Sequence, residues 1–114
     1  MNDRRAQELV AAERTRIEAA LRELTGEVRA EGALARQQEG ESDAGSELAT
    51  EMVEQALIGN LRAELEAVAR AEARIRAGTY GLSTESGIAI PDERLESEPL
   101  AERTVEEQRR SDAG

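Results

Sequence analysis

Apolar side chains in the first third of the chain recur at the spacing of one face of an α-helix. Between about residues 3 and 37 the sequence is polar except at a few positions, which are separated by steps of four, three and four residues and are Ile17, Leu21, Leu24 and Val28. This spacing places the apolar side chains along one seam of a helix. A long amphipathic helix is therefore predicted to reach about Gln37.

A second seam follows after a short polar break. The break runs from Gly40 to Gly45, and Asp43 or Ser42 within it is a suitable N-cap for a new helix. This helix is predicted to end before Gly78, because glycine is favoured just beyond a helix C-terminus. Its apolar positions alternate three- and four-residue steps, interrupted by one charged residue, and are Ile58, Leu61, Leu65, Val68 and Ile75.

Two seams of similar length joined by a short break predict an antiparallel coiled-coil hairpin over residues 1–77. At about 1.5 Å per residue each arm would be roughly 50 Å long. The tip of the hairpin would lie at residues 39–46.

The pattern changes after residue 78. Two short apolar runs, 80–82 and 87–90, flank a polar turn and indicate a small β-hairpin. Pro91 is predicted to start a short helical turn, and Pro99 to open a last helix that ends at about Arg110. Residues 78–110 would thus form a small globular module with a C-terminal helix, followed by a disordered tail at 111–114.

The composition favours helices with narrow seams over a large core. Tyr80 is the only aromatic residue, and 35% of the chain is charged. Without runs of β-branched or aromatic residues a substantial sheet is not expected, so the predicted fold class is mainly α. No long apolar run is present, and a soluble, cytoplasmic protein without a membrane contact is expected.

The negative charge is concentrated in the middle of the chain. The formal net charge is −10, and residues 39–54 contain six carboxylates without a basic residue: Glu39, Glu41, Asp43, Glu47, Glu51 and Glu54. Because Lys and Arg supply most non-specific affinity for nucleic acids, direct binding to DNA or RNA is not expected. A basic protein surface or a bound cation is the partner that this charge favours.

Residues 83–107 have the layout of a four-cysteine zinc finger, yet the chain contains no cysteine. Two pairs keep the spacing of such ligands, Ser83 with Ser86 and Thr104 with Glu107. Hydroxyl groups are poor structural ligands for zinc, and one carboxylate cannot complete a closed site. We interpret these four residues as vacant zinc-ligand positions and expect no bound zinc.

Other interactions must replace a structural metal in this module. One hypothesis is that Ser83, Ser86 and Thr104 donate hydrogen bonds around Glu107; the alternative, given equal weight, is that all four side chains are exposed to solvent. An apolar plug is also predicted, consisting of Leu82, Ile88, Ile90, Leu95, Leu100 and Val105.

The residues around these positions resemble the DksA/TraR family of bacterial transcription regulators. The resemblance covers roughly residues 42–108 and is strongest at Gly78-Thr79-Tyr80-Gly81, Gly87, Ile90-Pro91 and Arg94-Leu95-Glu96. It implies a helical hairpin followed by a degenerate zinc-finger module and a C-terminal helix. It also implies a regulator that binds RNA polymerase directly through its secondary channel and modulates initiation without contacting DNA.

The resemblance further implies that the hairpin tip enters the polymerase. Members of the family carry an Asp-x-x-Asp-x-Ala tip, and Asp43 matches its second acidic position. Gly40 and Gly45 depart from the pattern, although Glu39 and Glu41 flank Gly40 and Ala44 precedes Gly45. The candidate tip residues are therefore Glu39, Glu41, Asp43 and Ala44, with Asp43 also a candidate helix cap.

The sequence argues against an enzyme. Histidine and cysteine are absent, and neither a glycine-rich phosphate loop nor a strand-turn-helix context for a serine nucleophile is present. The rival to a polymerase regulator is a coiled-coil adaptor or self-associating protein that kept the fold and lost polymerase binding, and a DNA-binding finger is a third alternative. A monomer is expected, and the response to the nucleotide ppGpp is left open.

Overall fold

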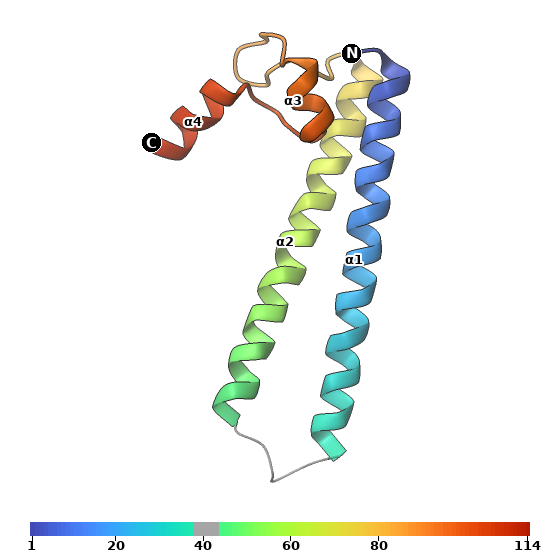
Figure 1. The fold of residues 1–114 in the computed structure, drawn as a ribbon, viewed down its shortest axis with the longest axis vertical. Helices are drawn as coiled ribbons and strands as arrows, with labels where there is room; N and C mark the ends of the chain where they lie inside the picture. Colours follow the sequence, from blue (N-terminus) through green and yellow to red (C-terminus); the bar gives the residue numbers. More distant parts are fainter. Residues whose placement is uncertain (38–43) are drawn as a thin grey trace. The chain divides into compact units, whose positions relative to one another are not determined.

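The computed structural model describes the backbone of residues 1–37 and 44–114 and the side chains of residues 1–26 and 47–114. These residues form the α-helices α1 (Asp3–Gln37), α2 (Ala44–Ala77), α3 (Asp92–Ser97) and α4 (Val105–Ala113). In the described part of the chain the predicted β-hairpin is reduced to one isolated antiparallel bridge between Leu82 and Ala89. The mainly α fold class with a long helical hairpin is confirmed (Figure 1).

The chain divides into two compact units. Thr15–Glu66 is one unit, and Met1–Arg14 with Ala67–Gly114 is the other. Within each unit the segments of α1 and α2 run antiparallel (Figure 1). The division into residues 1–77 and 78–110 rests on the sequence pattern, and it stays a prediction.

In the unit Thr15–Glu66, burial follows the predicted seams. Ile17 of α1 is fully buried and Ile58 of α2 is 5% exposed. An ion pair between Arg16 and Glu64 joins the two helices at 3.9 Å. Because both charged side chains are about half exposed, this pair contributes at most about 1 kcal/mol, and apolar burial supplies most of the pairing energy.

The other unit contains the helix ends and the finger module. Its helical core consists of Ala6, Val10, Val68 and Ala71, all nearly inaccessible to solvent. All four are small or β-branched, which lets the two helices approach closely. Beside this core the guanidinium of Arg14 binds the carboxylate of Glu72 through two hydrogen bonds, of 2.7 and 3.2 Å.

Gly78 ends α2 as the sequence predicts. Its φ of 77° lies in the left-handed region, which glycine adopts without a Cβ penalty. The N–H of Thr79 donates to the carbonyl of Arg74 at 2.9 Å, and the N–H of Gly78 donates to that of Ile75 at 3.2 Å. These two bonds form a Schellman motif, which satisfies the last carbonyls of the helix.

The N-terminus is tied to the finger module by charged contacts within the same unit. The α-amino group of Met1 lies 3.0 Å from the carboxylate of Asp92. Arg5 binds Glu96 through two hydrogen bonds, of 2.5 and 2.8 Å, and this contact lowers the pKa of Glu96 below its ordinary value. A bidentate pair of this kind fixes orientation as well as charge, so it sets the register of α3 on α1.

The predicted last helix is corrected at both ends. It begins at Val105, not at Pro99, because Thr104 caps it and the preceding residues form turns. Pro99 is buried and its carbonyl accepts a 2.9 Å hydrogen bond from the hydroxyl of Tyr80. Helix α4 continues to Ala113, so residues 111–113 are helical and not the disordered tail that the sequence predicts.

The predicted apolar plug is partly wrong. Ile90 and Leu95 are buried, and Leu100 is half-buried. Leu82, Ile88 and Val105, in contrast, are 39%, 61% and 42% exposed. A module this small buries only part of its apolar surface, and three of the six side chains stay exposed.

No helix in the described part of the chain combines the length and the apolar character that a membrane span requires.

Candidate functional site

The serine pair predicted from spacing forms a tight turn. The hydroxyl oxygen of Ser83, which is 5% exposed, accepts hydrogen bonds from the N–H groups of Glu85 and Ser86 at 3.1 and 3.2 Å. The N–H of Gly87 donates to the carbonyl of Ser83 at 2.9 Å, and Gly87 has a φ of 76°. Ser83 thus organises this turn with both its side chain and its backbone, as a short hydroxyl side chain commonly does.

The second pair forms the start of α4. The hydroxyl oxygen of Thr104 accepts from the N–H of Glu107 at 3.2 Å, and the Glu107 carboxylate accepts from the N–H of Thr104 at 2.9 Å. This reciprocal arrangement is a capping box, which satisfies two backbone donors that the first helical turn leaves unpaired. A Thr-x-x-Glu sequence therefore has a local structural role, independent of any metal.

The structure brings the two pairs together around Glu107. Hydrogen bonds from the side chain of Ser86, the backbone of Thr104 and the side chain of Ser83 lower the pKa of the Glu107 carboxyl group to about 2. Glu107 is only 4% exposed, so its negative charge is held by these donors rather than by water. We call Ser83, Ser86, Thr104 and Glu107 the carboxylate cluster.

The chemistry of the carboxylate cluster does not suit structural zinc. Zinc in small closed sites takes thiolate and imidazole ligands, whereas this cluster offers three hydroxyl groups and one carboxylate. The hydroxyl oxygens of Ser83 and Ser86 already accept hydrogen bonds from backbone N–H groups, and the Glu107 carboxylate accepts one from the N–H of Thr104. In the described residues, no group of three His, Cys, Asp or Glu side chains is placed to hold a metal ion.

A second carboxylate, Glu102, connects the finger module to α2, a role that no sequence motif indicates. Arg70 and Arg74 of α2 both contact its carboxylate, at 3.0 and 3.5 Å. Its carbonyl accepts hydrogen bonds from the N–H and the hydroxyl of Thr84, at 2.9 and 3.2 Å. In a chain with so many carboxylates, no spacing distinguishes Glu102 from its exposed neighbours.

The candidate tip residues Glu39, Glu41 and Asp43 lie outside the described residues. Ala44 begins α2, and its side chain is also outside the described set. Their proposed contact with a partner, and the capping role of Asp43, stay predictions.

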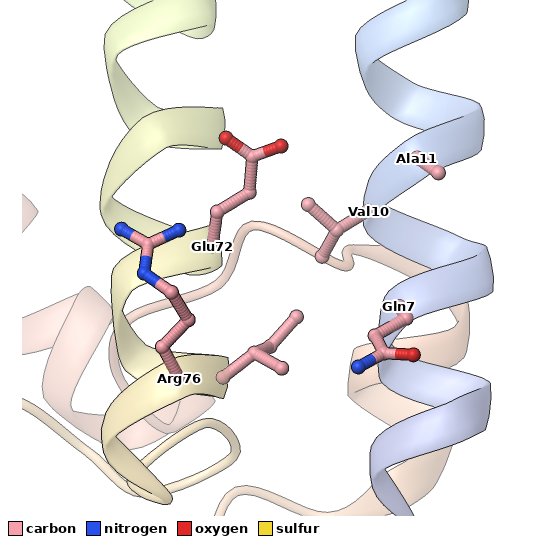
Figure 2. A pocket seen from close by; sticks show the side chains of 6 residues that line it. Gln7, Val10, Ala11, Glu72 and Arg76 are labelled. Carbon is pink, nitrogen blue, oxygen red and sulfur yellow. The ribbon is translucent and has the colours of Figure 1, made fainter.

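A shallow groove of about 320 Å³ lies between α1 and α2 in the unit that holds the finger module. Figure 2 shows Gln7, Val10 and Ala11 on α1 facing Glu72 and Arg76 on α2, and Ile75 completes the lining. The Glu72 carboxylate is bound by Arg14, which lowers its pKa. The groove lacks a nucleophile or a carboxyl group with a raised pKa, so its lining offers no catalytic arrangement.

Because of the carboxylate cluster, we expect the free energy of unfolding to fall in acid. Because the folded-state pKa of Glu107 is about 2, below its ordinary value of 4.5, the cluster stabilises the fold fully above about pH 4.5. That contribution is lost as the pH falls from about 4.5 to 2. At pH 7 the variant Glu107→Gln should melt roughly 5–10 °C below the wild type, because it loses charged hydrogen bonds.

The melting temperatures of wild type and Glu107→Gln, followed by circular dichroism from pH 7 to pH 2.5, test this expectation. The difference in melting temperature should shrink as the pH falls. Protonation removes the negative charge of Glu107 from the wild type, and the substitution has already removed that charge from the variant. Glu106→Gln, one residue away and exposed, is the matched control. A constant difference across the pH range would contradict the role of the Glu107 charge.

Comparisons with known proteins establish the fold. No known family model matches the chain. General stress protein 16O of Bacillus subtilis (strain 168) is 40% identical over 67 residues, which are 59% of this chain, and the chain spans 41% of that relative's length. The solved structure of transcription factor DksA2 from Pseudomonas aeruginosa matches with a TM-score of 0.82 over 97% of this chain and 83% of DksA2, at 22% identity. The chain therefore has a DksA/TraR-like fold, with a finger module that contains no cysteine.

Proposed function

We propose that this protein is a transcription regulator that binds RNA polymerase directly through its secondary channel and modulates initiation without binding DNA. The observation that carries the proposal is the likeness to DksA2, a protein described as a transcription factor, over 97% of this chain. Fold alone does not specify function, so the proposal also draws on the charge and on the residues at the tip.

The charge supports a protein partner. With a formal net charge of −10, the chain would be repelled by the phosphates of nucleic acid. A channel lined with Lys and Arg would instead attract it and speed its association, in a manner that weakens as salt is added.

The tip carboxylates are the proposed effectors. A carboxylate held at the connection between two helices can perturb a nearby Mg²⁺ ion or basic loop, because the charge of a metal ion dominates its site. Asp43 and Glu41 are the residues that we assign to this role, with Glu39 and Ala44 beside them.

We further propose that the finger module folds without zinc. In this proposal the carboxylate cluster takes the place of a cross-linking metal, and it is supported by the contacts of Arg5 and Glu102, which tie the module to α1 and α2. The regulator would then respond neither to chelators nor to thiol oxidation.

Binding to purified core RNA polymerase, together with transcription in vitro, tests the function. The wild type should bind at low salt and change the yield of initiated transcripts. The variant Asp43→Asn with Glu41→Gln should keep binding and lose most of the transcriptional effect, because it removes tip charge and leaves the helices intact.

The control Glu23→Gln with Glu66→Gln makes the same charge change at exposed positions of α1 and α2, and it should behave as the wild type. Failure of the wild type to bind at low salt would contradict the proposed function. If the tip variant changes transcription as the wild type does, the proposed role of the tip is refuted, while the proposed binding to polymerase stands.

One observation favours the second candidate, a helical adaptor or self-associating protein. Large apolar side chains of α2, among them Met52 at 64% exposure, are exposed in the described part of the chain. An adaptor would show a stable complex with another protein or a second copy and no effect on transcription. Light scattering of the purified protein would detect self-association directly.

A further inference from the structure

The apolar seams of α1 and α2 repeat so regularly that apolar contacts alone do not fix how the two helices pair. In α1 apolar residues recur every seven positions, at Val10, Ile17 and Leu24. In α2 two series have the same interval, and they are Ile58 with Leu65, and Leu61 with Val68 and Ile75. A seven-residue repeat presents the same pattern after a shift of seven residues. Pairing in a shifted register would therefore bring apolar residues together again.

One charged pair interrupts this repeat. Glu72 takes a seam position of α2, and the guanidinium of Arg14 on α1 binds its carboxylate through two hydrogen bonds, of 2.7 and 3.2 Å. The two side chains are only 37% and 35% exposed. Glu72 and the buried Val10 of α1 line the same groove and face each other (Figure 2). The pair therefore lies at the seam between the helices and not on their outer surfaces.

A shifted register would break this pair. If α2 moved along α1 by seven residues, Val10 would meet Val68, so an apolar contact would be kept at that level. Arg14 would instead meet the apolar Leu65, and Glu72 would lose its guanidinium partner. A partly buried charge without a counter-charge is unfavourable, because it has given up water and gained nothing in return. The charged pair thus distinguishes two registers that the apolar residues do not.

We propose that Arg14 and Glu72 are positioning residues that select one register of α1 against α2. A polar group at a single seam position is a well-attested way to specify register in paired helices. In an antiparallel hairpin the register decides which residues lie at the turn. Arg14 and Glu72 would thereby keep the tip carboxylates Glu41 and Asp43 where the proposed function needs them. This consequence rests on the proposed function, whereas the selection of a register does not.

A second cross-helix ion pair provides a contrast. Arg16 and Glu64 lie 3.9 Å apart, and their side chains are 57% and 47% exposed. Water can solvate both charges if the helices shift, so an exposed pair discriminates only weakly between registers. Burial, and not the presence of opposite charges as such, is what gives Arg14 and Glu72 the proposed role.

Electron paramagnetic resonance of a doubly spin-labelled protein tests the register. Because the chain contains no cysteine, Ala19→Cys and Ala73→Cys, at exposed positions of α1 and α2, direct the labels to two sites only. With Arg14 and Glu72 in place, one distance between the labels is expected. The seam variant, Arg14→Leu with Glu72→Leu, should show a second population, displaced by roughly 10 Å along the helix axis. Its melting temperature should not fall, because leucine buries apolar surface in place of the charges.

Two variants control for the loss of charge. Arg14→Glu with Glu72→Arg keeps the pair in reversed order and should restore a single distance. Arg16→Leu with Glu64→Leu removes the exposed pair and should also leave a single distance. If the seam variant aggregates, Arg14→Ala with Glu72→Ala takes its place, and the same second population is expected.

Three results would overturn the inference. One distance in the seam variant, at any melting temperature, would mean that the pair does not select the register. Two distances with Arg14 and Glu72 in place would mean that the pair is insufficient to select it. A second distance that appears only together with a concentration-dependent dimer in light scattering would assign the pair to discrimination against a second copy.

Transcription in vitro separates this inference from the proposed function. The seam variant should lose part of the effect on transcription in proportion to its shifted population, although every tip carboxylate is present. Absence of polymerase binding by the wild type would refute the proposed function and leave the measured register standing. A shifted register with an undiminished effect on transcription would refute the link between the register and the tip.

Discussion

Replacing Ser83, Ser86, Thr104 and Glu107 with cysteine is expected to create a zinc site in a protein that has no cysteine. In the structure the Thr104 N–H donates to the Glu107 carboxylate, and Ser83 and Ser86 lie near enough to lower its pKa, so the four positions lie close to one another. Four thiolates around a common point satisfy the tetrahedral geometry of a structural site, with Zn–S distances of about 2.3 Å. The apparent binding energy of such sites near neutral pH is about 10–16 kcal/mol.

The metal-free form of this variant should be less stable than the wild type, because it loses the hydrogen bonds of Glu107. Zinc should restore the fold and raise the melting temperature above that of the wild type. Metal analysis should find one zinc ion per chain, and cobalt substituted for zinc should give the visible absorption of a tetrahedral thiolate site.

A variant with the same number of cysteines provides the control. Moving two of them by one residue, to Thr84→Cys and Glu106→Cys, points two thiolates away from the common point and should abolish tight binding. If the four-cysteine variant stays helical but takes up no zinc at equimolar concentration, the four positions are not the equivalents of metal ligands.

The helical hairpin and its turn into the finger module are predictable from the sequence, because each depends on local rules. The three- and four-residue steps that include Ile17 and Ile58 mark faces that are buried in the structure. Gly78 ends α2 because a left-handed residue is needed there, and glycine provides it. In these cases the periodicity or the residue type has one favoured structural solution.

The details of the finger module are less predictable, because they depend on which groups a small module can cover. Nothing in the spacing separates the buried Ile90 from the exposed Ile88, two residues away. The sequence predicts that the last helix starts at Pro99, because proline is favoured at the first helical position. The reciprocal hydrogen bonds of Thr104 and Glu107 start α4 at Val105 instead. Tertiary packing decides which isoleucine is buried, whereas at the start of α4 a local capping box outweighs the preference of Pro99.

The carboxylate cluster is predictable from the sequence only in part. Spacing of the cluster residues pointed to one site, although only the structure distinguishes donors to Glu107 from exposed hydroxyl groups. Exposure of Leu48 and Met52 becomes evident only when the partner side of the helix is known.

Truncation of Leu95 to alanine is expected to destabilise the finger module strongly. Leu95 is 1% exposed, lies on α3, and would approach a Cβ at Gly81 to 3.4 Å, so the chain closes tightly around it. Removing a fully buried leucine side chain costs about 2–5 kcal/mol, because transfer energy is lost and a cavity remains. A module whose only aromatic residue is Tyr80 has few other apolar contacts to compensate.

Thermal and urea unfolding of Leu95→Ala, followed by circular dichroism, should show a fall of on the order of 10–20 °C in melting temperature. Ile88→Ala is the matched control in the same module: it removes an apolar side chain that is 61% exposed, and it should change stability by less than about 0.5 kcal/mol. Equal, small effects of both substitutions would mean that hydrogen bonds and ion pairs alone hold the module, and that the buried apolar cluster of Ile90 and Leu95 is not its core.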